Sequence, residues 1–260
     1  MILYNIYFSP TGGVKRAADL LSAEWDCEQQ QIDLCDPARD FSRDVFEPGD
    51  LCIVAVPAYG GRVPQPALAR LRRMTGRNTP VVLVAVYGNR AYDDTLLELK
   101  NALAPRGFCC VAAVAAVAEH SIMRQFGAGR PDGEDQKELA AFARSIRAKM
   151  AQPDGGGELL IPGAEPYRAY NGVPFKPKGS KKCVKCGLCA AQCPVEAIPA
   201  ARPDSTDEIR CISCMRCVSA CPRHARDLTG AMLFIASQKM KKACAGRKKN
   251  ELFLYTAKNG

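Results

Sequence analysis

Apolar runs of strand length alternate with amphipathic segments of helix length through the first 150 residues. Runs rich in β-branched and other apolar residues lie at 2–8, 30–34, 51–56, 81–87 and 108–118. Those at 51–56 and 81–87 are continuously apolar, as is typical of strands that are buried on both faces. The pattern predicts five strands in the interior of one domain.

Helical spacing of apolar residues follows each of these strands. Amphipathic helices are expected from the glycines at 12–13 to about Trp25 and over 65–74, 93–104 and 133–150. Strands that alternate with helices predict a parallel sheet with right-handed connections. The expected fold class is therefore α/β, with a doubly wound parallel sheet of five strands in the order 2-1-3-4-5.

The composition of the chain changes after residue 151. A run of glycines and five prolines within 152–179 predicts a linker or a strap that lies along the surface. The segment 227–242 has the spacing of a helix whose apolar side is expected to pack on a neighbouring domain; the spaced residues are Leu228, Met232, Ile235 and Lys239. The expected units are 1–151, the linker 152–179, a small cysteine-rich module over 180–226, and a basic helix and tail over 227–260.

Eight of the 14 cysteines form two copies of the pattern C-x2-C-x2-C-x3-C-P. This spacing is typical of bacterial 2[4Fe-4S] ferredoxins. Three thiolates wrap one short loop around a cluster, whereas the fourth begins a helix that points away, so it ligates the other cluster. The sequence thus predicts two [4Fe-4S] clusters in a small α+β module, one held by Cys183, Cys186, Cys189 and Cys221 and the other by Cys193, Cys211, Cys214 and Cys217.

Other uses of these cysteines fit the sequence less well. Structural zinc needs two separated pairs of ligands and no obligatory proline after the last one. Disulfides are not expected because the chain begins with an apolar strand and shows no signal peptide. The cysteines outside the pattern are expected to act as small core residues; they are Cys27, Cys35, Cys52, Cys109, Cys110 and Cys244.

Three unusual loops follow the first, third and fourth strands. The first, Ser9-Pro10-Thr11-Gly12-Gly13, can present backbone N–H groups to a phosphate at a helix N-terminus. The others span 57–62, with Ala58, Tyr59 and Gly60, and 87–92, with Gly88, Asn89 and Tyr92. In the expected strand order the three strands are neighbours, so these loops should meet at one edge of the sheet, where ligands bind in such folds.

The first 150 residues resemble a flavodoxin domain, and the whole chain is similar to the flavodoxin–ferredoxin fusion proteins of anaerobes (the EFR1-type family). The segments that carry the resemblance are SPTGG at 9–13, VPAYGGRVP at 56–64, YGNRAYDD at 87–94, AEHS at 118–121 and GRPD at 129–132. The resemblance implies FMN, with its phosphate on Ser9, Thr11, Gly12 and Gly13 and its ring between the loops around Tyr59 and Tyr92, near Gly88 and Asn89. Val14 departs from the family, whose phosphate loops commonly carry a hydroxyl residue there.

The combination predicts an electron-transfer iron–sulfur flavoprotein that passes electrons between two clusters and FMN, to or from a redox partner in anaerobic metabolism. An electron carrier is favoured over a substrate-specific oxidoreductase, because no catalytic constellation and no nicotinamide motif are found. Two alternatives stay open. One is a flavoenzyme that reduces a small substrate at the FMN rim, beside Arg62, Arg90 and His120. The other is a flavin-free module that senses or docks through its clusters.

Charge bears on partners and compartment. The formal net charge of +9 falls to roughly +3 once clusters and a flavin phosphate are counted, so nucleic acid is not implied. No stretch approaches the roughly 20 apolar residues of a membrane span, and a cytoplasmic protein is expected. Two interpretations of the basic tail stay open: it docks an acidic redox partner or an anionic surface, or it is a solvated helix end. Its cations are Lys239, Lys241, Lys242, Arg247, Lys248, Lys249 and Lys258.

Overall fold

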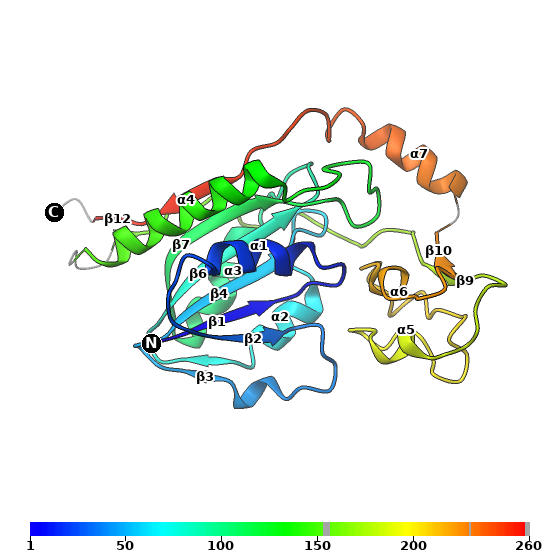
Figure 1. The fold of residues 1–260 in the computed structure, drawn as a ribbon, viewed down its shortest axis with the longest axis horizontal. Coiled ribbons are helices and arrows are strands. Elements are labelled where there is room, and N and C mark those ends of the chain that lie inside the picture. Colours follow the sequence, from blue (N-terminus) through cyan, green and yellow to red (C-terminus); the bar gives the residue numbers. More distant parts are fainter. Residues whose placement is uncertain (153–156, 229, 258–260) are drawn as a thin grey trace.

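The computed structural model describes residues 1–152, 157–228 and 230–257, and it is built on a six-stranded sheet (Figure 1). The strand order is β11-β7-β6-β4-β1-β2. The five parallel strands are those expected from the apolar runs, and their order matches the flavodoxin-like arrangement. They are β1 (Ile2–Tyr7), β2 (Glu28–Asp33), β4 (Leu51–Pro57), β6 (Thr79–Tyr87) and β7 (Phe108–Val117).

Helices cover both faces of this sheet, which explains why the central strands are apolar throughout. Alternate residues of β4 point to opposite faces: Ile53 packs with α1 (Gly13–Ser22) and α4 (Gly133–Met150), whereas Val54 packs with α2 (Gln65–Leu71) and α3 (Thr95–Leu103). Short 3-10 turns lie at Phe41–Arg43 and Ala104–Arg106, and β3 (Val45–Phe46) pairs with β5 (Thr75–Gly76).

The sixth strand corrects the expectation of a five-stranded sheet. β11 (Glu251–Leu254) comes from the C-terminal tail and pairs antiparallel with β7, so that Phe253 lies opposite Ala113. Its four residues follow a run of cations, and nothing in their short apolar pattern marks them as part of a sheet formed mainly by the first 120 residues. The described part of the tail therefore returns to the first domain and adds a strand to its sheet.

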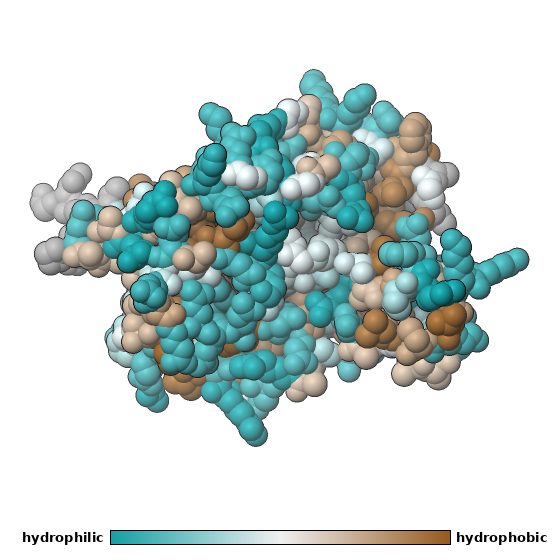
Figure 2. Space-filling view, in the orientation of Figure 1, coloured by the Kyte–Doolittle hydropathy of each residue, from teal (hydrophilic) through white to brown (hydrophobic). Residues whose placement is uncertain are grey.

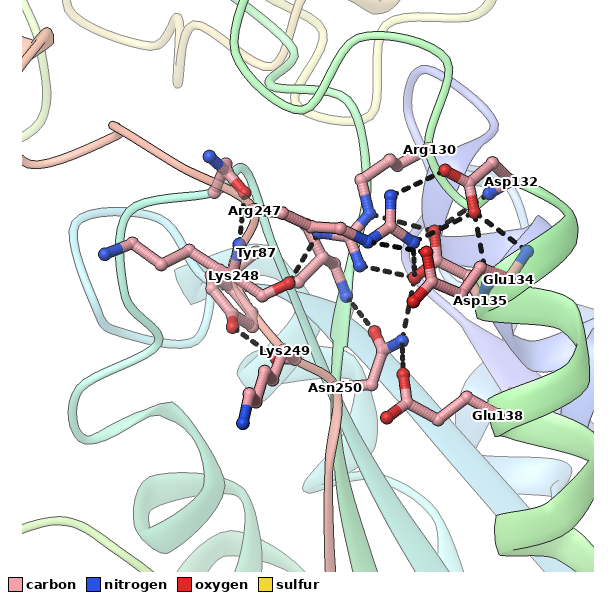
Figure 3. Close-up of polar contacts among 12 residues, drawn as sticks. Tyr87, Arg130, Asp132, Glu134, Asp135, Glu138, Arg247, Lys248, Lys249 and Asn250 are labelled. Atoms are coloured by element: carbon pink, nitrogen blue, oxygen red, sulfur yellow. Dashed lines mark hydrogen bonds and ion pairs between the residues drawn. The ribbon is translucent and has the colours of Figure 1, made fainter.

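A polar network ties this returning segment to α4 (Figure 3). The buried amide of Asn250 donates to the Asp135 carboxylate at 2.8 Å and to Glu138 at 2.6 Å, and its oxygen accepts from the N–H of Val117. Arg130 forms a buried ion pair with Asp135. Arg247 pairs with acids around the start of α4, at 2.7 Å from Asp132, 3.2 Å from Glu134 and 3.3 Å from Asp135.

The proline-rich segment runs along the surface of the first domain as a strap over the described residues 157–177. The carboxylate of Asp94 accepts from the N–H groups of Ala164 at 3.0 Å and Arg168 at 2.7 Å. Arg62 donates to the carbonyl oxygen of Arg168 at 2.8 Å. The strap begins at β8 (Gly157–Glu158), which pairs with β12 (Thr256–Ala257). Pro153 and most of the glycine run lie outside the described residues.

The cysteine-rich module lies beyond the carboxyl ends of the parallel strands (Figure 1). It contains α5 (Leu188–Ala191) and α6 (Arg216–Ser219), and β9 (Lys178–Gly179) pairs with β10 (Arg226–Asp227). The chain then forms α7 (Gly230–Met240) before it returns to the sheet. Ile235 of α7, expected to pack on a neighbouring domain, is 58 % exposed. Among the described residues, no helix has the length and apolar character needed to cross a lipid bilayer.

Candidate functional site

The structure gathers the eight cysteines into two groups of four, each lining its own cavity. The first, here set I, consists of Cys183, Cys186, Cys189 and Cys221. The second, set II, consists of Cys193, Cys211, Cys214 and Cys217. Each set takes its fourth cysteine from the other copy of the sequence pattern, which is the crossed arrangement that the spacing predicts.

The backbone of the two copies repeats as well as the sequence. Positive φ angles occur at Lys185 (55°) and Gly187 (77°) and recur at the equivalent positions Ser213 (55°) and Met215 (63°). Non-glycine residues adopt this left-handed conformation only where the surroundings hold them there. The ligand loops of the two copies thus share the same backbone conformation.

The cavities fit an iron–sulfur cluster better than a single ion. Within the described residues, no three His, Cys, Asp or Glu side chains converge closely enough to hold one metal ion, whereas each cysteine set surrounds an open volume. Backbone N–H groups already point at the sulfurs: Ala197 donates to Cys193 and Ala225 to Cys221, both at 3.2 Å. Such donors stabilise thiolates and tune the potential of a cluster.

A buried arginine lies between the two cysteine sets. Arg226 is 2 % exposed, and its guanidinium donates to the carbonyl oxygens of Pro203 and Pro177 and to Thr206. Its charge counteracts the effect of burial, which raises the pKa of Cys189 in set I and of Cys217 in set II. The guanidinium therefore acts electrostatically on both sets, and its hydrogen bonds hold the loops between them in place.

The two sets differ in exposure. Set I has one exposed ligand, Cys186, and one buried ligand, Cys189, whereas set II has no exposed ligand and two buried ones, Cys193 and Cys214. The apolar neighbours expected to limit solvent divide in the same way: Val184 is 60 % exposed beside set I, but Met215 is only 4 % exposed beside set II. Set II is the enclosed site and set I the open one.

Set II is fastened to the first domain by basic side chains. Arg70 of α2 donates to the carbonyl oxygen of Pro194 at 2.6 Å, directly after Cys193. Arg216, between Cys214 and Cys217, reaches the carbonyl oxygen of Ser9 at 3.4 Å and Asp33 at 3.7 Å. The enclosed cysteine set is thus held against the loop that follows β1.

A cavity of about 580 Å³ lies beside set II, at the carboxyl ends of β1, β4, β6 and β7. The three loops expected to meet at this edge do meet there. Six of the ten residues predicted to bind a cofactor line it: Thr11, Gly13, Ala58, Tyr59, Gly60 and Gly88. The loop of set II contributes Ile212 and Ser213, and Ile212 also lines the set II cavity.

Two glycines of these loops are required by close contacts. A Cβ at Gly88 would lie 2.8 Å from atoms of His120, and one at Gly60 would lie 2.1 Å from the ring of Tyr170. Gly12 has a different role, because it caps α1 with φ +91° and has open space around its Cβ position. Ser9 is buried, and its Oγ accepts from the N–H of Lys15 at 2.9 Å, within the first turn of α1.

Asn89 and Tyr92 do not line the cavity, which corrects the expectation that both approach a flavin ring. The amide of Asn89 donates at 2.8 Å to the carbonyl oxygens of Cys244 and Gly246. The hydroxyl of Tyr92 donates to Glu251 at 2.8 Å. Both side chains turn toward the returning C-terminal segment, which supplies polar partners that the loop pattern alone does not reveal.

Both arginines of the predicted rim pair with acids, but Asp93, the partner of Arg90, also pairs with Arg168 at 2.8 Å. Arg62 pairs with buried Glu98 at 2.6 Å and is not part of the cavity lining, whereas Arg90 lines the cavity and pairs with Asp93. His120 does reach the cavity. Its Nδ1 accepts from the N–H groups of Ile122 and Met123, both at 3.2 Å, and burial lowers its pKa. The neutral ring therefore carries its proton on Nε2.

The sequence did not predict the part of the cavity lining that comes from the strap and α7, here called the roof. The strap contributes Tyr170 and Phe175, and α7 contributes Lys239 and Met240. Tyr59 lies between this roof and set II, where burial and then the charge of Cys214 raise the pKa of its hydroxyl well above the usual value. The aromatic residues within the proline-rich segment are the one signal that could have predicted a strap over a ligand site.

Comparison with known protein families identifies the cysteine-rich module. Residues 182–226 match the family described as the 4Fe-4S dicluster domain. This match confirms the prediction of a [4Fe-4S] module in this part of the chain. The comparison with curated proteins gave no match.

Several solved structures resemble the first domain. A flavodoxin from Streptococcus pneumoniae TIGR4 is 16 % identical, with a TM-score of 0.42 over 57 % of this chain and 99 % of that one. Flavodoxin 2 from Bacillus cereus is 15 % identical, with a TM-score of 0.43 over 57 % and 99 %. Rubredoxin:oxygen oxidoreductase from Desulfovibrio gigas is 15 % identical, with a TM-score of 0.41 over 58 % and 37 %. The flavodoxin-like fold of this chain follows from its own strand order. The chain thus joins a flavodoxin-like domain to a 4Fe-4S dicluster domain.

Proposed function

We propose that this protein is an electron-transfer iron–sulfur flavoprotein, in which two [4Fe-4S] clusters exchange electrons with FMN in the large cavity. The observation that supports this most directly is the position of Ile212. This residue lines both the set II cavity and the large cavity, so the two volumes adjoin at its side chain. A cluster and a flavin bound there would be near neighbours.

The lining of the large cavity suits FMN. Thr11, Gly13 and Val14 line it at the first turn of α1, where unpaired backbone N–H groups favour a phosphate. Tyr59, Tyr170 and Phe175 supply flat apolar surface for a ring system. His120 presents an N–H donor to the same volume. When bound, FMN connects one-electron centres to two-electron chemistry.

The chain's own residues shield the large cavity from water and hold set II in place. The strap and α7 cover the cavity, and Arg70 and Arg216 hold set II against the first domain. Set I is exposed, so it is the centre that a redox partner can approach. The proposed path runs from partner to set I, set II and flavin, or in reverse. A role in anaerobic metabolism and membership of the EFR1-type family stay predictions.

Of the two alternatives, the flavoenzyme loses support from Arg62, which pairs with Glu98 and does not line the cavity, but keeps Arg90, which lines the cavity and shares Asp93 with Arg168. The flavin-free module differs from the relay in its cofactor content, which can be measured. Anaerobically purified protein should contain FMN. On stepwise reduction, cluster and flavin absorption should change together. Protein that folds and binds iron but never flavin, or whose flavin is reduced only after the clusters are removed, would contradict the relay.

A further inference from the structure

The two cysteine sets differ in what surrounds them, and this difference identifies where a partner docks. Set II is enclosed by the first domain, the strap and its own buried ligands. Around set I, the residues at the mouth of the cavity are exposed, including the ligand Cys186 itself. Because electron transfer weakens steeply with distance, a partner protein gains most by docking over set I.

The surface over set I has an apolar centre and a basic rim; we call it the set I face. Val184 (60 % exposed) and Leu188 (37 %) stand beside Pro222 in the lining of the cavity. The exposed cations of the face are Lys181, Lys182, Lys185 and Arg223. In the space-filling view, brown apolar side chains adjoin teal ones over the region of α5 (Figure 2).

Charge on this face is not balanced by the protein. No acidic residue is found in the lining of the set I cavity, as far as the described chain extends. Lys181, Lys182, Lys185 and Arg223 form no ion pair within the described residues, whereas neighbouring Lys178 pairs with Glu208 at 2.7 Å. A thiolate-ligated cluster is itself negative and offsets part of this charge, but four cations exceed it.

We propose that the set I face is the docking site of an acidic, one-electron carrier protein. A small apolar patch inside a ring of uncompensated cations has the features of a transient redox interface, in which charge steers the encounter and the apolar centre excludes water. This proposal names the partner class for the proposed function and rests on it only in assuming that electrons pass through the clusters.

The basic tail is the other candidate for an acidic partner, and three of its cations, Lys241, Lys242 and Lys249, are exposed, but none of them lines a cysteine cavity. Arg247 is paired with Asp132, Glu134 and Asp135, and Lys239 lines the roof of the large cavity. Lys258 lies outside the described residues. Lys185 and Arg223 are exposed and line the set I cavity, so the set I face brings exposed cations closer to a cysteine set than the tail does.

Charge reversal of Lys181 and Lys182 tests the proposal, because both are exposed and neither lines the cluster cavity. The reductant is a reduced plant-type [2Fe-2S] ferredoxin, used as the acidic probe, and the readout is bleaching of the cluster absorption in anaerobic stopped flow. At low ionic strength, K181E/K182E should slow the reaction at least about tenfold and K181Q/K182Q by an intermediate factor. The wild-type rate should fall as salt is added.

Matched controls separate docking from damage. R16E/K137E reverses two exposed cations on α1 and α4 and should keep the wild-type rate. All variants should contain wild-type iron and react equally with photoreduced deazariboflavin, an uncharged reductant. Unchanged reaction of K181E/K182E with ferredoxin, or equal slowing by R16E/K137E, would overturn the proposal. A third outcome would also overturn the proposal: the wild type binds phosphatidylglycerol vesicles, and its rate with ferredoxin does not depend on these charges. The face would then be a lipid-binding site. Since only cluster bleaching is read, failure of electrons to reach the flavin would count against the relay and leave the docking result intact.

Discussion

Arg216 and Ser9 are 207 positions apart in the sequence, yet a guanidinium nitrogen of Arg216 donates to the carbonyl oxygen of Ser9 at 3.4 Å. Arg216 belongs to the loop that carries Cys214 and Cys217, and Ser9 begins the loop predicted to hold the flavin phosphate. One side chain therefore connects the enclosed cysteine set with the phosphate end of the large cavity.

Replacing Arg216 with Gln should loosen the phosphate loop. The contact is partly exposed, so its loss is expected to cost about 0.5–1 kcal/mol, or roughly a two- to fivefold rise in the Kd of FMN. Fluorescence titration of flavin-depleted protein measures this. Arg210→Gln, which removes an exposed pair with Glu196 at 3.3 Å, is the matched control and should bind FMN like the wild type. Equal affinity of all three proteins would exclude a role for Arg216 in this loop.

The crossed cysteine sets make a prediction that pairs of substitutions can decide. Cys193 and Cys211 line one cavity, so C193S/C211S should lose one cluster and keep the other, leaving about four irons of the about eight in the wild type. Cys211 and Cys221 line different cavities, so C211S/C221S should lose both clusters. Iron and sulfide analysis of anaerobic protein gives the answer. The reverse ranking of the two variants would mean that each sequence copy ligates its own cluster.

Gly12→Val should weaken FMN binding through backbone strain. The residue has φ +91° and free space at its Cβ position, so the expected effect comes from conformation and not from a clash. A strain of about 1–2 kcal/mol corresponds to a loss of affinity of roughly tenfold. Gly49→Val, at a loop glycine without a positive φ and with open space, is the control. Wild-type affinity in Gly12→Val would disprove the assignment of this loop to the phosphate.

His120 should make the stability of the protein depend on pH. Burial lowers the pKa of His120 in the folded state, whereas the unfolded value is about 6.5. The unfolded chain therefore binds the extra proton first, and stability should fall as the pH drops below about 6.5 toward the lowered pKa. Anaerobic urea unfolding between pH 7.5 and 5 should show this loss in the wild type but not in His120→Asn, whose carboxamide oxygen can replace Nδ1.

The other histidine of the chain gives the control for this experiment. His224 is exposed, and His224→Asn tests whether loss of a histidine alone alters the unfolding profile. The same pH dependence in the wild type and in His120→Asn would mean that His120 does not titrate between the two states in this range.

Local patterns predicted the centre of the site, and long-range contacts determined the rest. The repeated cysteine pattern implies that the fourth cysteine of each copy ligates the other cluster, so it could assign Cys221 to the first cavity from the sequence. Parallel strands place their loops at one edge, which correctly brought Thr11, Tyr59 and Gly88 together. Asn89 could not be placed in this way, because its partners are carbonyl groups of a segment more than 150 residues away. The short strand β11 was missed for the same reason.

The position of β11 has a consequence for how this protein can be divided. The chain leaves the sheet, folds the whole cysteine-rich module, and only then supplies the strand that covers the edge of β7. In spatial terms the module is an insertion into the first domain and not an appendage to it. A fragment cut after residue 151 would leave the long, apolar edge of β7 unpaired and free to associate with other chains. To separate the first domain from the cysteine-rich module without aggregation would therefore require a circular permutation, or a short bridge that keeps residues 244–255 with the sheet.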